Sequence, residues 1–267
     1  MSVMSRSKRP LHAADGHGLL ARCVRRLIRR ALRRRFAAVW SNEPPVVPVG
    51  QPVVVCANHS NWWDGFVAAA TTDMLSGRRF WLLQQEEHLR RYDWFRRCGV
   101  IGIDLRGGTG ALPGLRRALG VLQEDPHAFL WIFPQGRLTH PAEPIEVKPG
   151  ARFLAKHSGA LMLPVIIRYD WQGGARPSIW LRWGQPLPSA ASAEELQLAM
   201  QGLATELDCA LRVGHWPDST PWWPPRRSIN QSWDRWAGCW RGLGRGRRKD
   251  PPSRPSPAAP VPGDKKA

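Results

Sequence analysis

The chain has 267 residues, which is enough for one large domain with appendages. Lysine and arginine number 39 against 21 acidic residues, so the formal net charge is +18, which favours an anionic partner: nucleic acid, an anionic membrane face or a phosphorylated ligand. The five cysteines are scattered without a Cys-x-x-Cys pair, which excludes a disulfide framework and the usual zinc spacing.

The termini differ in composition from the middle of the chain. Residues 1–17 are expected to be disordered. No run of about 18 apolar residues occurs, so we expect no transmembrane helix. The N-terminus also lacks the apolar core and cleavage site of a secretory signal. Together with the unpaired cysteines, these features favour a reducing, cytoplasmic-side location.

Residues 18–48 are predicted to form a basic amphipathic helix and a proline-rich linker. Three interpretations stay open: a helix docked on its own domain, a helix lying among lipid headgroups, or an RNA-binding arm. The apolar positions at helical spacing are Leu20, Val24, Leu27, Ile28, Ala31 and Leu32, and arginines occupy most of the others.

Residues 49–213 alternate between strand and helix patterns, which predicts an α/β domain with a mixed, largely parallel sheet flanked by helices. Ser192 is predicted to cap the last helix. The expected strands cover 52–57, 78–85, 100–105, 128–134, 161–170 and 178–184, and the expected helices cover 64–74, 86–99, 110–125, 150–158 and 192–212.

The C-terminal part of the chain is rich in tryptophan and arginine. Residues 214–242 are predicted to be either a partly ordered cover for the domain or a second interfacial anchor, because both residue types suit the headgroup boundary. Residues 243–267 are rich in proline and are expected to be a disordered tail.

A histidine and an aspartate follow the first strand of this domain. His59 lies two residues beyond the predicted strand end, where ligands of open α/β sheets gather, and Asp64 is placed to begin the next helix. The four intervening residues allow the carboxylate to reach one imidazole nitrogen and leave the other free to take a proton. No Gly-x-Ser-x-Gly elbow is present, and Cys56 falls within the strand, so the pair suits direct activation of a substrate hydroxyl.

Four sequence blocks in order resemble the glycerolipid acyltransferase family, which includes the lysophosphatidate acyltransferases. The first is NHSNWWD, which begins at Asn58 and matches the family's NHx4D block. The second is GVIGIDLRGG from Gly99, the third is FPQGRLTH from Phe133, and the fourth places Pro164 within an apolar strand. Together they span roughly residues 50–185.

The resemblance implies transfer of a fatty acyl chain from acyl-CoA or acyl carrier protein, as a co-substrate, to a hydroxyl of a lipid acceptor. His59 would be the general base and Asp64 its orienting partner, with no metal and no bound cofactor. Backbone amides near Gly136 are candidates to stabilise the oxyanion, and Asn58 and Pro164 are carried over as candidate substrate-binding positions.

The chain departs from the family pattern in two blocks. Arg106 follows Asp104 one position later than the family's arginine, and Arg137 comes one position earlier. Gln135 replaces the usual glutamate. These residues are candidates to hold the acceptor's phosphate or glycerol portion, and a neutral amide at 135 also suits a sugar or another polyol.

The preferred interpretation is therefore a peripheral, membrane-associated acyltransferase on the cytoplasmic face that acts on a lysophospholipid such as lysophosphatidate. Its partners would be anionic lipids, the lipid acceptor and the thioester donor, without nucleic acid. Acylation of a glycolipid or carotenoid glycoside is the alternative substrate class. The alternative from another functional class is a non-catalytic basic protein that binds membranes or nucleic acid.

Overall fold

The structure is a computed structural model that describes residues 18–48, 50–106, 109–171, 174–214 and 218–223. The segments predicted to be disordered, 1–17 and 243–267, lie outside the described residues, as does most of the predicted extension 214–242. All described residues belong to one compact unit, Met1–Arg226.

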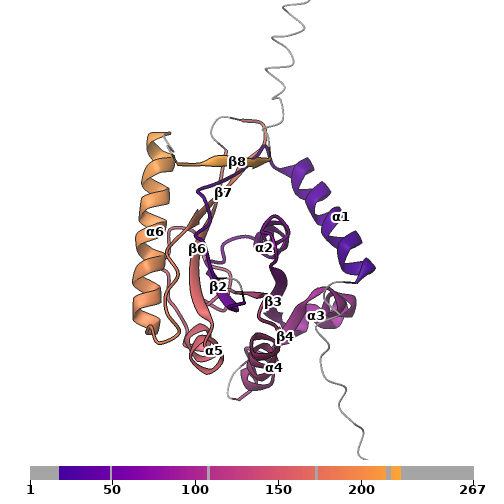
Figure 1. The fold of residues 1–267 in the computed structure, drawn as a ribbon. Coiled ribbons are helices and arrows are strands. Elements are labelled where there is room, and N and C mark those ends of the chain that lie inside the picture. Colours follow the sequence, from indigo (N-terminus) through magenta and orange to yellow (C-terminus); the bar gives the residue numbers. More distant parts are fainter. Residues whose placement is uncertain (1–17, 49, 107–108, 172–173, 215–217, 224–267) are drawn as a thin grey trace, which may run out of the picture. The chain divides into compact units, whose positions relative to one another are not determined.

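Within the described part, the strands form a mixed, largely parallel sheet in the order β4-β3-β5-β2-β6-β7-β1-β8, as predicted (Figure 1). Neighbouring strands from β4 to β6 all run parallel, whereas β7 is antiparallel to β6 and β8 to β1. The strands are β1 Val39–Ser41, β2 Val53–Ala57, β3 Arg79–Gln85, β4 Val100–Ile103, β5 Ala128–Ile132, β6 Leu161–Asp170, β7 Ser178–Trp183 and β8 Thr220–Trp223.

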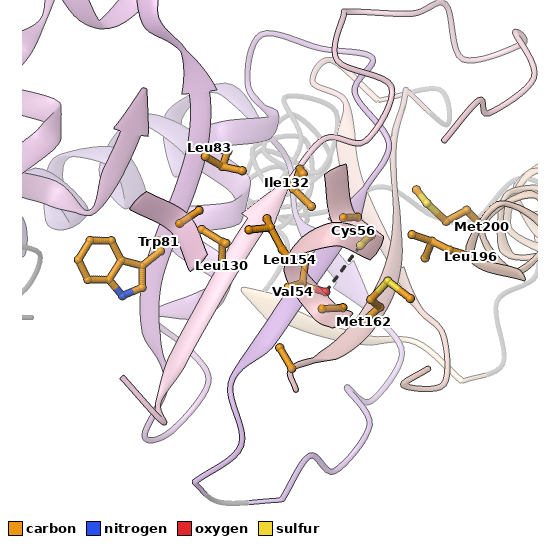
Figure 2. Packing of buried hydrophobic residues seen from close by; sticks show 14 of the residues in the cluster. Val54, Cys56, Trp81, Leu83, Leu130, Ile132, Leu154, Met162, Leu196 and Met200 are labelled. Atoms are coloured by element: carbon orange, nitrogen blue, oxygen red, sulfur yellow. Dashed lines mark hydrogen bonds between the residues drawn. The ribbon is translucent and has the colours of Figure 1, made fainter. Parts of the chain in front are cut away.

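Helices cover both faces of the sheet (Figure 1). Alternate residues of β2 enter different layers: Val54 and Cys56 pack with α4, α5 and α6, whereas Val53 and Val55 pack with α1 and α2. Figure 2 shows the first of these two layers. The helices are α1 Leu19–Arg35, α2 Asp64–Thr72, α3 Glu86–Arg91, α4 Ala111–Glu124, α5 Gly150–Ser158 and α6 Ala193–Val213.

Most predicted elements are present with small shifts at their ends. Ser192 caps α6 through a capping box with Glu195, as predicted. The helix expected over 86–99 is instead α3 followed by a 3₁₀ helix, Asp93–Cys98, because Tyr92 leaves the helical region with φ −135° and ψ 59°. No helix among the described residues is long and apolar enough to cross a bilayer.

Two short strands at one end of the sheet, β1 and the edge strand β8, are absent from the sequence-based prediction. The segment 18–48, expected to be a helix and a linker, contains β1, and the predicted tryptophan-rich extension contributes β8. β1 pairs with β7 and β8, so its backbone groups find partners only after distant segments come together. Strands this short carry no periodic signal of their own.

Helix α1 is docked on its own domain. Its buried residues Ala21, Val24 and Leu32 face the body of the protein, and Arg25 forms an ion pair with Asp73 just after α2, with 2.7 Å between Nε and Oδ1. Leu20 and Leu27 remain exposed beside this face. Docking is thus the arrangement present, and contact of the exposed side with lipid stays a prediction.

Candidate active site

The carboxyl ends of β2, β5 and β6 meet at one edge of the sheet. β2 lies between β5 and β6, with Cys56 opposite both Ile132 and Pro164. The loops that follow β2 and β5 therefore leave the sheet side by side. This register brings together the first and third sequence blocks and the end of the strand that carries the fourth.

His59 and Asp64 are in contact, as the spacing predicted. The Nδ1 atom of His59 lies 2.9 Å from Oδ2 of Asp64. Asp64 opens α2 and is fully buried, and the same Oδ2 accepts hydrogen bonds from the backbone N–H groups of Ser60 and Asn61, each at 2.8 Å. These bonds and the helix N-terminus stabilise a buried carboxylate. The catalytic roles of the pair stay predictions.

The contact with Asp64 sets the direction of the imidazole ring. With Nδ1 bound to the carboxylate, Nε2 points away from it, and none of the described residues hydrogen-bonds Nε2. The ring stacks on Phe133 with 4.2 Å between centroids and 15° between planes, and 24% of the side chain is exposed. A substrate hydroxyl could therefore approach Nε2 from solvent.

Gln135 and Thr139 fix the backbone of His59. Oε1 of Gln135 accepts a hydrogen bond from the His59 N–H at 2.9 Å, and Nε2 of Gln135 donates to Thr139 Oγ1 at 2.7 Å. The Thr139 N–H donates to the His59 carbonyl at 2.8 Å. Gln135 is buried and both ends of its amide are engaged. Gln135 therefore supports the loop that carries His59. Its observed hydrogen bonds give no indication that it also contacts substrate.

Asn58 and Pro164 are also buried within the scaffold. The Asn58 amide bridges to β6: Oδ1 accepts from the Ile167 N–H at 2.7 Å, and Nδ2 donates to the Ile167 carbonyl at 3.2 Å. Pro164 lies opposite Cys56 in the sheet. Both residues hold the two strands in place, so their expected role in substrate binding stays a prediction.

Gly136 occupies a tight turn. Its φ of 69° lies in the left-handed region that favours glycine, and its N–H donates to the Phe133 carbonyl at 2.9 Å. That amide is engaged in the turn, so the expectation that it stabilises an oxyanion is not supported. A Cβ at this position would come within 2.9 Å of Nζ of Lys148, an exposed lysine that therefore borders the same turn.

The two candidate phosphate-binding arginines are exposed and paired with carboxylates. Arg106 donates to Asp104 through Nε at 3.0 Å and Nη2 at 2.8 Å, and these bonds lower the pKa of Asp104 to about 2. Arg137 donates to Glu143 at 3.0 Å. Arg137 follows β5, next to the His59 loop. Arg106 follows β4, three strands from β2, or roughly 14 Å at the usual strand spacing.

Sequence reasoning missed Tyr169. Its hydroxyl donates to Oδ1 of Asp64 at 2.6 Å. Tyr169 lies 105 positions from Asp64, and only the pairing of β6 with β2 brings the two together. The alternation of side chains along β6 could have placed Tyr169 on the same face as Ile167 and Val165, but it gives no sign of a partner.

Two comparisons with known proteins find similar proteins. The family model described as Acyltransferase matches residues 39–168, which contain the loops after β2, β4 and β5. The crystal structure of the 1-acyl-sn-glycerophosphate (LPA) acyltransferase PlsC from Thermotoga maritima is similar in fold, with a TM-score of 0.53 at 19% identity. The match covers 71% of this chain and 80% of that one.

Residues 39–168 form an acyltransferase domain. The acyltransferase domain includes His59, Asp64, Arg106 and the turn at Gly136. No curated protein matches the chain. The family model supports acyl transfer as the general function, and the likeness to PlsC shows a common fold.

Proposed function

We propose that this protein is a membrane-associated O-acyltransferase that moves a fatty acyl chain from acyl-CoA or acyl carrier protein to a hydroxyl of a lipid acceptor. The single observation that carries the proposal is the geometry of His59. Its Nδ1 is held by the buried Asp64, while its Nε2 has no hydrogen-bond partner among the described residues and lies on a partly exposed ring.

In the proposed reaction, Nε2 of His59 takes the proton of the acceptor hydroxyl as its oxygen attacks the thioester carbonyl. The new C–O bond gives a tetrahedral intermediate, which collapses with loss of the thiolate. The imidazolium then returns its proton to the thiolate, so the products are an ester and a free thiol. Asp64 stabilises the imidazolium between these steps.

The nearest thiol does not suit a covalent intermediate. Cys56 is fully buried in β2 and packs in the layer of α4, α5 and α6. Burial raises the pKa of its thiol, so the nucleophilic thiolate is disfavoured. Direct transfer from the thioester to the acceptor is therefore the preferred route.

We prefer a lysophospholipid such as lysophosphatidate as the acceptor. Arg106, Arg137 and Lys148 lie on loops at the edge that carries His59. Exposed ion pairs such as Arg106–Asp104 contribute little to stability, and a phosphate that accepts two hydrogen bonds from arginine can replace the carboxylate. The ion pairs Arg106–Asp104 and Arg137–Glu143 also favour the second candidate, a glycolipid or carotenoid glycoside, because a neutral headgroup would leave both ion pairs intact.

The decisive experiment gives the purified protein a labelled acyl thioester and a panel of acceptors. Wild type should form an ester, and His59→Ala should lose about 100- to 10,000-fold in rate. His140→Ala is the matched control, because His140 is exposed and outside the Asp64 contact. Unchanged transfer by His59→Ala would reject the mechanism. No transfer by wild type to any acceptor would favour the non-catalytic binding protein.

The acceptor panel separates the two substrate classes. If the acceptor is phosphorylated, Arg106→Gln and Arg137→Gln should raise KM for lysophosphatidate. If it is a glycoside, the two substitutions should leave KM unchanged and lysophosphatidate should be a poor acceptor. Acyl-CoA and acyl carrier protein thioesters tested side by side identify the donor.

We also propose that the protein binds the cytoplasmic face of a membrane without crossing it. Exposed Leu20 and Leu27 of α1 lie among exposed arginines, a combination that suits lipid headgroups. Phe36, which ends α1, contacts Trp63 of the His59 loop with 5.5 Å between ring centroids. Trp62 beside it is 68% exposed. The carboxyl end of α1 thus adjoins the site where a lipid acceptor would enter.

Vesicle sedimentation tests this attachment. Removing α1 would also expose its buried contacts with α2, so point substitutions are preferable. Leu20→Gln with Leu27→Gln should weaken binding to phosphatidylglycerol vesicles, and high salt should release the wild type in part. Leu198→Gln is the control, because Leu198 of α6 is exposed to about the same extent as Leu27 and lies in the other helical layer. Equal binding of all variants would show that α1 is not the anchor.

A further inference from the structure

Tyr169 joins the end of β6 to the carboxylate that contacts His59. Its hydroxyl donates to Oδ1 of Asp64 at 2.6 Å, and this is the only hydrogen bond that the described residues give the phenol. Its ring packs against Phe36 with 5.6 Å between centroids. A phenylalanine would supply the same ring packing, so the contact that requires the hydroxyl is its hydrogen bond to Asp64.

The hydrogen bonds of Asp64 divide between its two oxygens. Oδ2 contacts Nδ1 of His59 and accepts from the N–H groups of Ser60 and Asn61. Among the described residues, Oδ1 has Tyr169 as its only donor. The loop after β2 thus holds one oxygen and β6 holds the other. The carboxylate cannot rotate about its Cβ–Cγ bond without breaking one of these sets.

We propose that Tyr169 is a positioning residue for acyl transfer, whose hydroxyl holds the Asp64 carboxylate in the orientation that presents Oδ2 to Nδ1 of His59. This role rests on the proposed function of the His59–Asp64 pair. It adds a third side chain, from the strand of the fourth sequence block, to the pair from the first block.

The phenol remains a donor at all ordinary pH values. Burial, the negative charge of Asp64 and the hydrogen bond to it all raise the pKa of Tyr169 well above its usual value. A fully buried carboxylate oxygen without a donor is costly, so loss of the hydroxyl favours other orientations of Asp64. In those orientations His59 loses the partner that fixes its ring and stabilises its imidazolium form.

The kinetic test uses the fact that the chain contains only two tyrosines, Tyr92 and Tyr169. Tyr169→Phe should lower kcat about 10- to 100-fold, as expected for a lost hydrogen bond to a charged group, with KM unchanged for both substrates. Tyr92→Phe is the matched control, because Tyr92 is exposed, and it should match wild type. Tyr169→Phe with the kcat of wild type would overturn the proposal.

A double substitution separates positioning from a general structural role. In the background of His59→Ala, Tyr169→Phe should cause no further loss of the residual rate, because the ring that Asp64 orients is gone. An equal loss with and without His59 would mean that the hydroxyl acts only on folding, and would reject the proposal. If wild type transfers no acyl group, the proposed function fails and this role fails with it.

The contact itself can be checked without activity. The variant Tyr92→Phe keeps Tyr169 as its only tyrosine. In an alkaline titration of this variant followed by phenolate absorbance, Tyr169 should ionise only above the usual range of a phenol or on unfolding. Adding Asp64→Asn should lower the pH at which Tyr169 ionises, since it removes the neighbouring charge. Ionisation of Tyr169 in the usual range while the protein is folded would show that Tyr169 is not buried against Asp64, and would overturn the proposal.

Discussion

The His59 backbone N–H donates to Oε1 of Gln135 at 2.9 Å, so the first and third sequence blocks are joined through the main chain beside the imidazole. The Gln135 amide also donates to Thr139, which in turn binds the His59 carbonyl. One of the positions at which this chain departs from the family pattern, Gln135, therefore shapes the loop of the proposed base.

Substitution of Gln135 tests this bracing role. Gln135→Leu should lower the free energy of unfolding by about 1–3 kcal/mol, because it leaves the part-buried His59 N–H without its acceptor and removes the donor to the Thr139 hydroxyl. Gln135→Glu should cost less, since a carboxylate can still accept from the His59 N–H. Urea denaturation measures both values. Equal stability of Gln135→Leu and wild type would show that the brace is dispensable.

Two glycines of α4 give a matched pair for packing against β4. A Cβ on Gly114 would lie 2.6 Å from the Gly102 carbonyl oxygen, whereas a Cβ on Gly120 meets nothing within 4 Å. Gly114→Ala should therefore destabilise the fold by about 1–3 kcal/mol, and Gly120→Ala should stabilise it by up to about 1 kcal/mol. Thermal unfolding of the two variants checks the opposite signs. The same sign in both would contradict the close approach of α4 to β4.

An ion pair between Arg168, the residue before Tyr169, and Asp208 connects β6 to α6. Nε and Nη2 of Arg168 donate to the two oxygens of Asp208 at 2.7 and 3.0 Å, and only 8% of the Arg168 side chain is exposed. Asp208→Ala should destabilise the protein by about 3 kcal/mol, because it leaves a buried charge unpaired. Asp93→Ala breaks an exposed pair with Arg96 and should cost under about 1 kcal/mol. Similar losses in the two variants would contradict this difference in burial.

Stability at high pH should depend on Tyr169. Its pKa is raised in the folded state above the ordinary value of 10.0, so above that pH the unfolded chain releases the phenol proton while the folded protein retains it. The folded state then binds more protons, and the free energy of unfolding falls as pH rises, by at most roughly 1.4 kcal/mol per pH unit. The stabilisation is fully present below pH 10.0.

Urea denaturation at about pH 9 and pH 11 measures this dependence. Wild type and Tyr92→Phe should lose more stability between the two conditions than Tyr169→Phe, which has no phenol to ionise at that position. An equal decline in all three proteins would mean that Tyr169 ionises as readily in the folded protein as in the unfolded chain.

The sequence by itself determined the parts of this protein that are encoded locally. Continuous apolar runs predicted β2 and β5, helical periodicity predicted α1 and α4, and Ser192 predicted the start of α6. The spacing of His59 and Asp64 predicted their contact, since only four residues separate them. Four ordered blocks predicted the acyltransferase domain, and the family comparison confirmed it.

Tertiary structure decided which polar groups complete the site. Tyr169 reaches Asp64 and Gln135 reaches His59 only because β6 and β5 pair on either side of β2, and no local pattern encodes that register. The short strands β1 and β8 form for the same reason, since each depends on partners far away in the chain. Short-range periodicity determines each helix and strand. Long-range strand pairing determines which residues lie beside His59 and Asp64 and hydrogen-bond to them.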